Sequence, residues 1–177
     1  MTQVLLTSFD PFGGRSVNAS HILARAAYAG LRGPLKRRVH HVSLPVDHAR
    51  AAAAIGDLIA RQRRGALRRI VMTGEWSGSA LRLERHARPG PLAPWRRGVS
   101  TPTQGPMPAP FRRRGLATFT SCDAGRYVCD TTFWAAASIL RAPGVSVMFV
   151  HVPRDVTDPS EPRGRAIAAA LGELIAA

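Results

Sequence analysis

The sequence has little cysteine, almost no lysine, few aromatic residues and no long apolar run. Cys122 and Cys129 are its only cysteines; two thiols are too few for a disulfide scaffold, and alone they cannot form a structural zinc site. No apolar stretch approaches the roughly 20 residues that a membrane helix needs, and the first residues do not resemble a signal peptide. We therefore expect a cytoplasmic protein without a membrane partner.

Charge is strongly unbalanced, since 25 basic residues face only 11 acidic ones and the formal net charge is +14. Lys36 is the single lysine. Clustered basic residues are typical of nucleic-acid binding. The arginines here are scattered along the chain with almost no aromatic residues between them, which favours a solvated arginine surface. We expect no specific nucleic-acid partner, only weak non-specific binding to polyanions.

Strand-like apolar runs alternate with helical patterns along the chain. Strands are expected at residues 4–7, 39–44, 70–73, 116–121 and 145–150, and helices at about 19–31, 47–63 and 163–175, with another beginning near Cys129. Strands separated by helices are typical of βαβ units with helices on both faces of the sheet. The pattern predicts an α/β protein, a three-layer α/β/α fold with a mainly parallel open sheet, in which residues 1–177 form a single domain.

One stretch, at about residues 88–114, breaks this alternation. It contains seven prolines and three glycines and follows neither the strand period nor the helix period. Such composition is typical of a long connection. We predict an irregular loop there.

Cys129 and His151 stand out because of their positions. Cys129 follows a β-rich run and begins a helical pattern, and a thiol in the first turn of a helix is stabilised as thiolate by the helix dipole. His151 ends an apolar strand. Residues at the carboxyl ends of parallel strands face the ligand crevice of such folds. The two residues are therefore candidates for a nucleophile and its base.

Four motifs in order along the chain extend this pair. They are Ser8-Phe9-Asp10-Pro11-Phe12-Gly13-Gly14, Gly74-Glu75-Trp76-Ser77-Gly78 with Leu83-Glu84-Arg85 after it, Ala124-Gly125-Arg126-Tyr127-Val128-Cys129-Asp130, and Phe149-Val150-His151-Val152-Pro153. The set resembles the signature motifs of the pyroglutamyl peptidase I family, also called pyrrolidone-carboxylate peptidases. The chain is similar to a divergent and shortened member of that family.

The resemblance implies a cysteine exopeptidase that removes pyroglutamate from the blocked N-terminus of a peptide substrate, without a metal or cofactor. It implies that Cys129 is the nucleophile, His151 the general base and later acid, and Glu84 the carboxylate that orients the imidazole. Members of the family often form oligomers, so a homo-oligomer is possible.

The same resemblance implies a substrate pocket for the flat, mostly apolar lactam ring. Its members, by position in the motifs, are Phe9, Phe12, Asn18, Val46, Glu75, Tyr127 and Val128. Phe9 and Phe12 match aromatic residues that flank the ring, and Asn18 matches a residue that hydrogen-bonds the lactam.

The chain also departs from the family pattern. Glu75 stands where the family has glutamine, Ser79 stands roughly where it has arginine, and Asp130 replaces the asparagine after the nucleophile. The segment between Glu84 and Cys129 is shorter by roughly 18 residues. Two alternatives stay open: a related Cys-His-Glu amidohydrolase with altered N-terminal specificity, or a catalytically silent binding protein with a basic surface.

Overall fold

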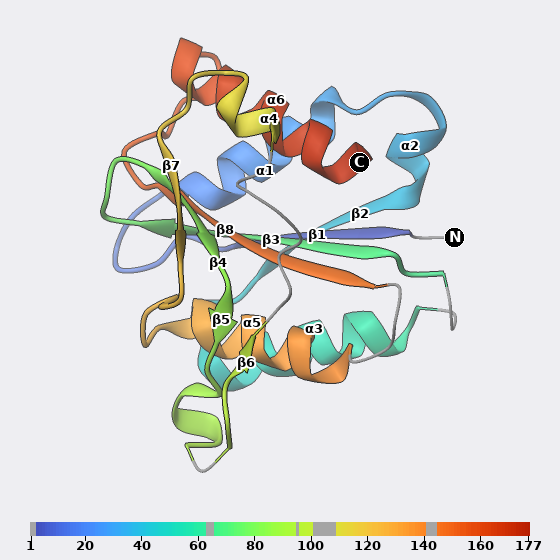
Figure 1. The fold of residues 1–177 in the computed structure, drawn as a ribbon, viewed down its shortest axis with the longest axis vertical. Helices are drawn as coiled ribbons and strands as arrows, with labels where there is room; N and C mark the ends of the chain where they lie inside the picture. Colours follow the sequence, from blue (N-terminus) through green and yellow to red (C-terminus); the bar gives the residue numbers. More distant parts are fainter. Residues whose placement is uncertain (1–2, 63–65, 95, 101–108, 141–144) are drawn as a thin grey trace.

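The computed structural model describes residues 3–62, 66–94, 96–100, 109–140 and 145–177. A six-stranded sheet in the order β2-β1-β3-β8-β4-β7 runs through the centre of the molecule (Figure 1). Its strands are β1 (Val4–Phe9), β2 (Val39–Leu44), β3 (Arg69–Trp76), β4 (Leu81–Glu84), β7 (Thr118–Ser121) and β8 (Ser146–Pro153). The first four strands of that order are mutually parallel, whereas β4 runs antiparallel to β8 and parallel to β7. The predicted α/β fold with a mainly parallel sheet is confirmed.

Helices cover both faces of this sheet. Figure 1 shows α1 (Ala19–Gly30), α4 (Ala109–Arg112) and α6 (Pro162–Ala176) on one face, and α3 (His48–Ala60) with α5 (Val128–Ile139) on the other. Asn18 and Asp47 cap α1 and α3 by accepting hydrogen bonds from the backbone N–H groups of Ser20 and Arg50. Both caps satisfy donors that a helix start otherwise leaves unpaired, and they fix where each crossover helix begins.

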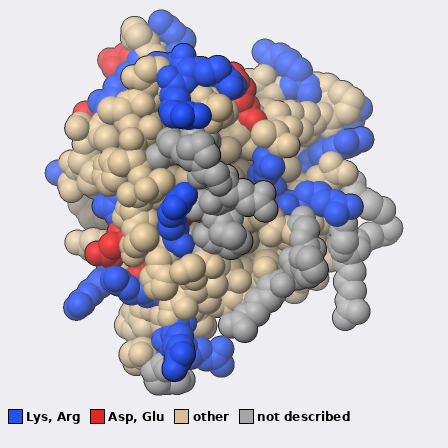
Figure 2. Space-filling view, viewed as in Figure 1, with Lys and Arg blue, Asp and Glu red and all other residues tan. Residues whose placement is uncertain are grey.

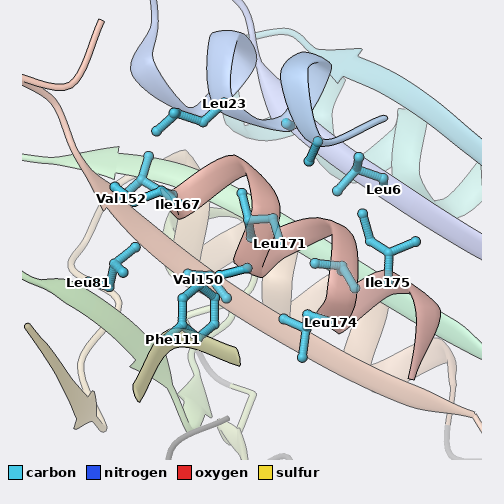
Figure 3. Packing of buried hydrophobic residues seen from close by; sticks show 14 of the residues in the cluster. Leu6, Leu23, Leu81, Phe111, Val150, Val152, Ile167, Leu171, Leu174 and Ile175 are labelled. Carbon is cyan, nitrogen blue, oxygen red and sulfur yellow. The ribbon is translucent and has the colours of Figure 1, made fainter. Parts of the chain in front are cut away.

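The core on the α1 and α6 face is a cluster of branched aliphatic side chains. In Figure 3, Ile167, Leu171 and Leu174 of α6 lie along β8, next to Val150 and Val152. Phe111 of α4 closes one side of the cluster and is fully buried. Each side chain of this size contributes roughly 1.5–3 kcal/mol when it leaves water, so α6 is held firmly over the central strands.

The core on the opposite face leads directly to the candidate site. Phe133 of α5 packs against Phe149 of β8 with ring centroids 5.5 Å apart, and both rings are fully buried. This aromatic contact fixes the first turns of α5 against the sheet. Cys129, one turn before Phe133, is thereby brought to the carboxyl ends of β3 and β8.

Several elements were not expected from the sequence, including helix α4 (Ala109–Arg112) inside the predicted irregular loop. Helix α2 (Gly33–Arg38) precedes β2, and β4 lies between the third predicted strand and the loop. Part of the predicted irregular loop, residues 95 and 101–108, lies outside the described residues. In the described part of that stretch, the short strands β5 (His86–Ala87) and β6 (Val99–Ser100) pair antiparallel, with the 3-10 turn η1 (Gly90–Leu92) between them.

Basic side chains are spread over the visible face in Figure 2, with only a few acidic ones between them. Arg113 and Arg114 both form ion pairs with Glu173 of α6. Among the described residues, no helix is both long and apolar enough to span a membrane.

Candidate active site

A cavity of about 560 Å³ opens at the carboxyl ends of β1, β3 and β8. Open α/β folds bind ligands at the carboxyl ends of their strands, in the crevice where the connections after two neighbouring strands cross to opposite faces of the sheet. All the predicted site residues except Glu84 line this cavity. Glu84 lies behind His151 and is fully buried.

Strand pairing brings the polar groups of the site into one row on the α5 face of the sheet. Gly74 of β3 is opposite His151 of β8, and His151 is opposite Arg82 of β4. Alternate residues of a strand share a face, so Glu84 lies on the same face as Arg82. The row therefore runs from β3 through β8 to β4.

The sulfur of Cys129 occupies the start of this row. A Cβ atom on Gly74 would stand 2.9 Å from the Cys129 Sγ and 3.0 Å from the ring of Phe149. Real Cβ atoms essentially never approach so closely, so the thiol fits there because position 74 has no side chain. Gly74 pairs with His151 on the adjacent strand, so the thiol on α5 lies over the strand next to that of the imidazole, and both residues line the same cavity.

His151 and Glu84 form the second contact of the row. Nδ1 of His151 lies 2.7 Å from Oε1 of Glu84, and both side chains are almost fully buried. A carboxylate only accepts hydrogen bonds, so Nδ1 carries the proton that it donates. The other ring nitrogen, Nε2, is then the basic one. This arrangement orients the imidazole so that Nε2 can accept a proton.

Arg82 also contacts the carboxylate of Glu84. Its Nε donates to Oε1 of Glu84 over 3.0 Å, and a terminal guanidinium nitrogen lies 2.8 Å from that oxygen. A buried carboxylate requires such compensation, because an isolated charge in the interior is strongly unfavourable. Arg82 therefore places a positive charge beside the buried carboxyl group of Glu84.

The resting charge state of Cys129 differs from the prediction. Burial raises the pKa of the Cys129 thiol to about 12; the backbone hydrogen bond at Cys129 lowers it, and Glu84, Asp130 and Glu75 raise it further. Desolvation outweighs the effect of the helix start, so the prediction of a thiolate stabilised by the helix dipole is wrong.

His151 is shifted in the complementary direction. Burial lowers the pKa of His151, although the hydrogen bond and the charge of Glu84 oppose this shift and Arg82 adds to it. The resting pair is thus a neutral thiol beside a neutral imidazole.

The walls of the cavity are largely apolar. Phe9 and Val128 are buried, and Phe12 and Tyr127 are exposed at 45% and 76%. Val46 follows β2 and is half-buried. These side chains give the cavity an apolar wall that is buried on one side and open to water on the other.

The two polar residues of the predicted pocket are already hydrogen-bonded within the protein. Asn18 donates from Nδ2 to the Asp10 carbonyl over 3.1 Å and accepts at Oδ1 from Ser20. Glu75 accepts from Arg15 and, over 2.8 Å, from the backbone N–H of Ala19. Each keeps spare capacity, because an amide has a second N–H and each carboxylate oxygen a second lone pair.

Several cavity residues were not expected from the sequence, including Trp76, Arg82 and Arg154. Gly74 belongs to one of the four motifs, but no role was predicted for it. The alternation Leu81-Arg82-Leu83-Glu84 is typical of a strand with Arg82 and Glu84 on one face. This pattern could have indicated that Arg82 lies beside Glu84 in the site. Within the described ranges, no group of three or more His, Cys, Asp or Glu residues is arranged to hold a metal ion.

The fold and this row of groups define an α/β protein with a thiol, an imidazole and a carboxylate at the carboxyl edge of its sheet. No protein-family model matches the sequence, and no curated protein matches it. Among solved structures, however, the chain has the fold of the pyrrolidone carboxyl peptidases, so the structure confirms the resemblance seen in the motifs.

Three of these structures show the extent of the likeness. Pyrrolidone carboxyl peptidase from Thermus thermophilus is 25% identical, with a TM-score of 0.67 over 96% of this chain and 99% of that one. A mutant of the enzyme from Pyrococcus furiosus is 19% identical, with a TM-score of 0.71 over 99% and 98%. The enzyme from Fervidobacterium islandicum AW-1 is 23% identical, with a TM-score of 0.66 over 98% of each chain.

Proposed function

We propose that this chain is a cysteine exopeptidase that hydrolyses the amide bond after an N-terminal pyroglutamyl residue. The observation that carries the proposal is the row of Cys129, His151 and Glu84 at the edge of an apolar cavity. The shared fold with the pyrrolidone carboxyl peptidases supports peptidase activity. A peptide with a blocked N-terminus is the proposed substrate.

Cys129 acts as the nucleophile in this proposal, with His151 as its base. Nε2 of His151 takes the thiol proton while Sγ attacks the carbonyl carbon of the pyroglutamyl residue. Substrate binding expels water from the cavity and coincides with proton transfer, so a resting thiolate is not needed. Glu84 stabilises the imidazolium that forms, without itself becoming protonated.

The start of α5 supplies the groups that hold the oxyanion. No side chain caps this helix, and the first N–H groups of a helix have no partner within it. The backbone N–H groups of Val128 and Cys129 therefore stabilise the negative oxygen of the tetrahedral intermediate.

Collapse of this intermediate breaks the C–N bond, and protonated His151 gives its proton to the leaving amine. The peptide departs with a free N-terminus, and a thioester remains on Cys129. A water molecule, deprotonated by His151, then attacks the thioester. Pyroglutamate leaves and the thiol of Cys129 regains its proton.

Selection of the lactam rests on shape and on two polar contacts. Phe9, Phe12 and Tyr127 enclose the ring, with Val46 and Val128 forming the rest of the wall. The second N–H of Asn18 donates to the lactam carbonyl, and Glu75 accepts from the lactam N–H. A substrate that leaves these groups unpaired loses binding energy.

The direct test is hydrolysis of pyroglutamyl-β-naphthylamide. We expect measurable turnover by the wild type and a loss of roughly 10³-fold or more in Cys129→Ala. Cys122→Ala is the matched control, because Cys122 is exposed and outside the cavity, and it is expected to retain activity. Equal rates in the wild type and Cys129→Ala would contradict the proposal.

A panel of other aminoacyl and acyl naphthylamides tests the specificity. Preference for a different acyl group would indicate an amidohydrolase with altered specificity. We further propose a cytoplasmic location, since a reducing compartment keeps both free thiols reduced.

A further inference from the structure

Arg82 contacts the carboxylate of the row and also lines the cavity, yet none of the sequence motifs accounts for it. Nε and a terminal nitrogen of Arg82 reach the same Glu84 oxygen, Oε1, that accepts from His151. Oε2 of Glu84 is buried and has no hydrogen-bond partner among the described residues. Two cationic or potentially cationic groups therefore share one oxygen atom.

The terminal nitrogen of Arg82 that approaches Glu84, Nη2, is also held by the edge of the sheet. It donates to Oγ of Ser121, at 3.1 Å, and to the backbone carbonyl of Asp123. The guanidinium also lies over the Trp76 ring, 4.7 Å from its centroid. The indole of Trp76 is itself held by a hydrogen bond from Nε1 to the Ala80 carbonyl, at 2.8 Å.

These contacts leave Arg82 little freedom, and its side chain is only 17% exposed. A planar guanidinium that donates in fixed directions is well suited to orient a carboxylate, and lysine does not reproduce this geometry. The contacts extend the row by one member, from sulfur through imidazole and carboxylate to guanidinium.

We propose that Arg82 is a positioning residue of the Cys129–His151–Glu84 machinery, which holds Glu84 against His151 and shares its negative charge. This inference rests on the proposed function, and it adds a residue that sets the working pH range of the base. Arg82 acts through Glu84 and His151, not on the reacting bond.

The physical consequence concerns the proton affinity of the His151–Glu84 pair. Burial lowers the pKa of His151, and the positive charge of Arg82, which offsets part of the Glu84 charge, lowers it further. Without this cation, the pair binds a proton more tightly, whichever atom carries it. His151 would then be protonated at a higher pH and unavailable as a base.

The first experiment compares the pH dependence of kcat/KM for pyroglutamyl-β-naphthylamide in the wild type and Arg82→Gln. We expect the acid limb of the variant to move to higher pH by about one unit or more. The activity near pH 7 should fall by roughly 10-fold to 100-fold. Arg113→Gln is the matched control, because it also removes one cation and an ion pair, but at Glu173, outside the cavity.

Arg82→Lys separates charge from geometry. It keeps the cation and loses the fixed pair of N–H donors, so its acid limb should stay near that of the wild type while kcat falls about tenfold. Ser121→Ala is a milder variant that removes one anchor of the guanidinium. Its acid limb should shift slightly in the same direction as that of Arg82→Gln.

A second readout does not depend on turnover. The titration of His151 is followed by NMR of ¹⁵N-labelled histidine side chains, with the signal assigned from His151→Gln. We expect a higher midpoint in Arg82→Gln than in the wild type. An upward shift combined with no hydrolysis by the wild type would support the role of Arg82 and contradict the proposed function.

Two results would overturn the inference. One is an unchanged His151 midpoint and an unchanged acid limb in a folded Arg82→Gln protein. If that variant does not fold, Arg82→Lys decides: full wild-type kcat in Arg82→Lys would show that the fixed donors of Arg82 do not position the carboxylate.

Discussion

At the scale of single residues, His151 is held by Glu84 and lines the same cavity as Cys129. The carboxylate fixes which ring nitrogen carries the proton, because Nδ1 donates to Oε1 over 2.7 Å. Burial favours the neutral form of both the thiol and the imidazole. The electrostatics of the site thus favour a neutral thiol and a neutral imidazole over a thiolate–imidazolium ion pair.

Glu84→Gln tests this balance at a single position. The amide oxygen of glutamine still accepts from Nδ1, but the charge that stabilises the imidazolium is lost. Activity is expected to fall by on the order of 10³-fold. The pKa of His151 should decrease further, because Glu84 raises it, so any residual activity should have its acid limb at lower pH.

The acid limb is thus expected to move to lower pH in Glu84→Gln and to higher pH in Arg82→Gln. General damage to the site would not move the two limbs in opposite directions, so each variant is a control for the other. Both are measured as pH profiles of kcat/KM. An acid limb that moves to higher pH in Glu84→Gln would contradict the assigned role of the carboxylate.

Individual site residues were predictable only where a strand end, a helix start or a family motif indicated them. Cys129 and His151 follow from strand ends and a helix start, and Glu84 from the resemblance. Arg82 was missed because it lies outside the motifs. Trp76 lies inside one, but its contact with Arg82 joins two strands that are not adjacent in the sheet. The triad roles and the substrate contacts stay predictions until variants are assayed.

At the scale of elements, the close packing of α5 on β3 depends on the absence of a side chain at Gly74. We predict that Gly74→Ala displaces the Cys129 sulfur, since the new Cβ would lie 2.9 Å from it. The expected destabilisation is about 1–3 kcal/mol, with a loss of activity larger than the loss of folded protein. Urea unfolding and kcat/KM measure the two effects.

Gly56→Ala is the matched control for this substitution. Gly56 lies within α3, where the new Cβ would meet only Ile139 Cδ1 at an ordinary 3.8 Å. Alanine is favoured over glycine in a helix interior by roughly 0.5–1 kcal/mol, so this variant should be slightly more stable and fully active. Similar behaviour of the two variants would argue against close packing at Gly74.

Most elements were predictable because their apolar periodicity is strong, as in α3, where Ile55 and Ile59 are buried at helical spacing. Strand β4 was missed for a physical reason. It is four residues long, and it carries Arg82 and Glu84 on the face that a short buried strand normally fills with apolar side chains. Its pairing with β8 is long-range and leaves no local signal. The single domain spanning residues 1–177 stays a prediction.

At the scale of the whole molecule, buried histidines couple stability to pH. Burial lowers the pKa of His41 to about 4, with His21, His40 and Arg25 adding to the shift. In the unfolded chain a histidine titrates near about 6.5, so the unfolded state binds more protons between these values. The contribution of neutral His41 is therefore fully present above about pH 6.5 and is lost as the pH falls to about 4.

We predict that the wild type loses more stability than His41→Gln between pH 7.5 and pH 4.5. In both proteins, Asp130 changes the stability in the opposite direction. Burial raises the pKa of Asp130 to about 6, so its protonation at low pH removes an unfavourable buried charge and stabilises the folded state. Urea unfolding at both pH values measures the difference. His86→Gln, on β5 and not among the groups that shift the pKa of His41, is the control, and equal losses in the wild type and His41→Gln would exclude this role of His41.

The position of β8 has a consequence for biosynthesis. β3 and β4 are consecutive strands, yet β8 separates them in the sheet, and it arrives only with the last fifth of the chain. A nascent polypeptide that has left the ribosome as far as the thiol still lacks the imidazole and the central strand that buries it. The row of thiol, imidazole and carboxylate is therefore complete only after that strand has inserted and closed the sheet.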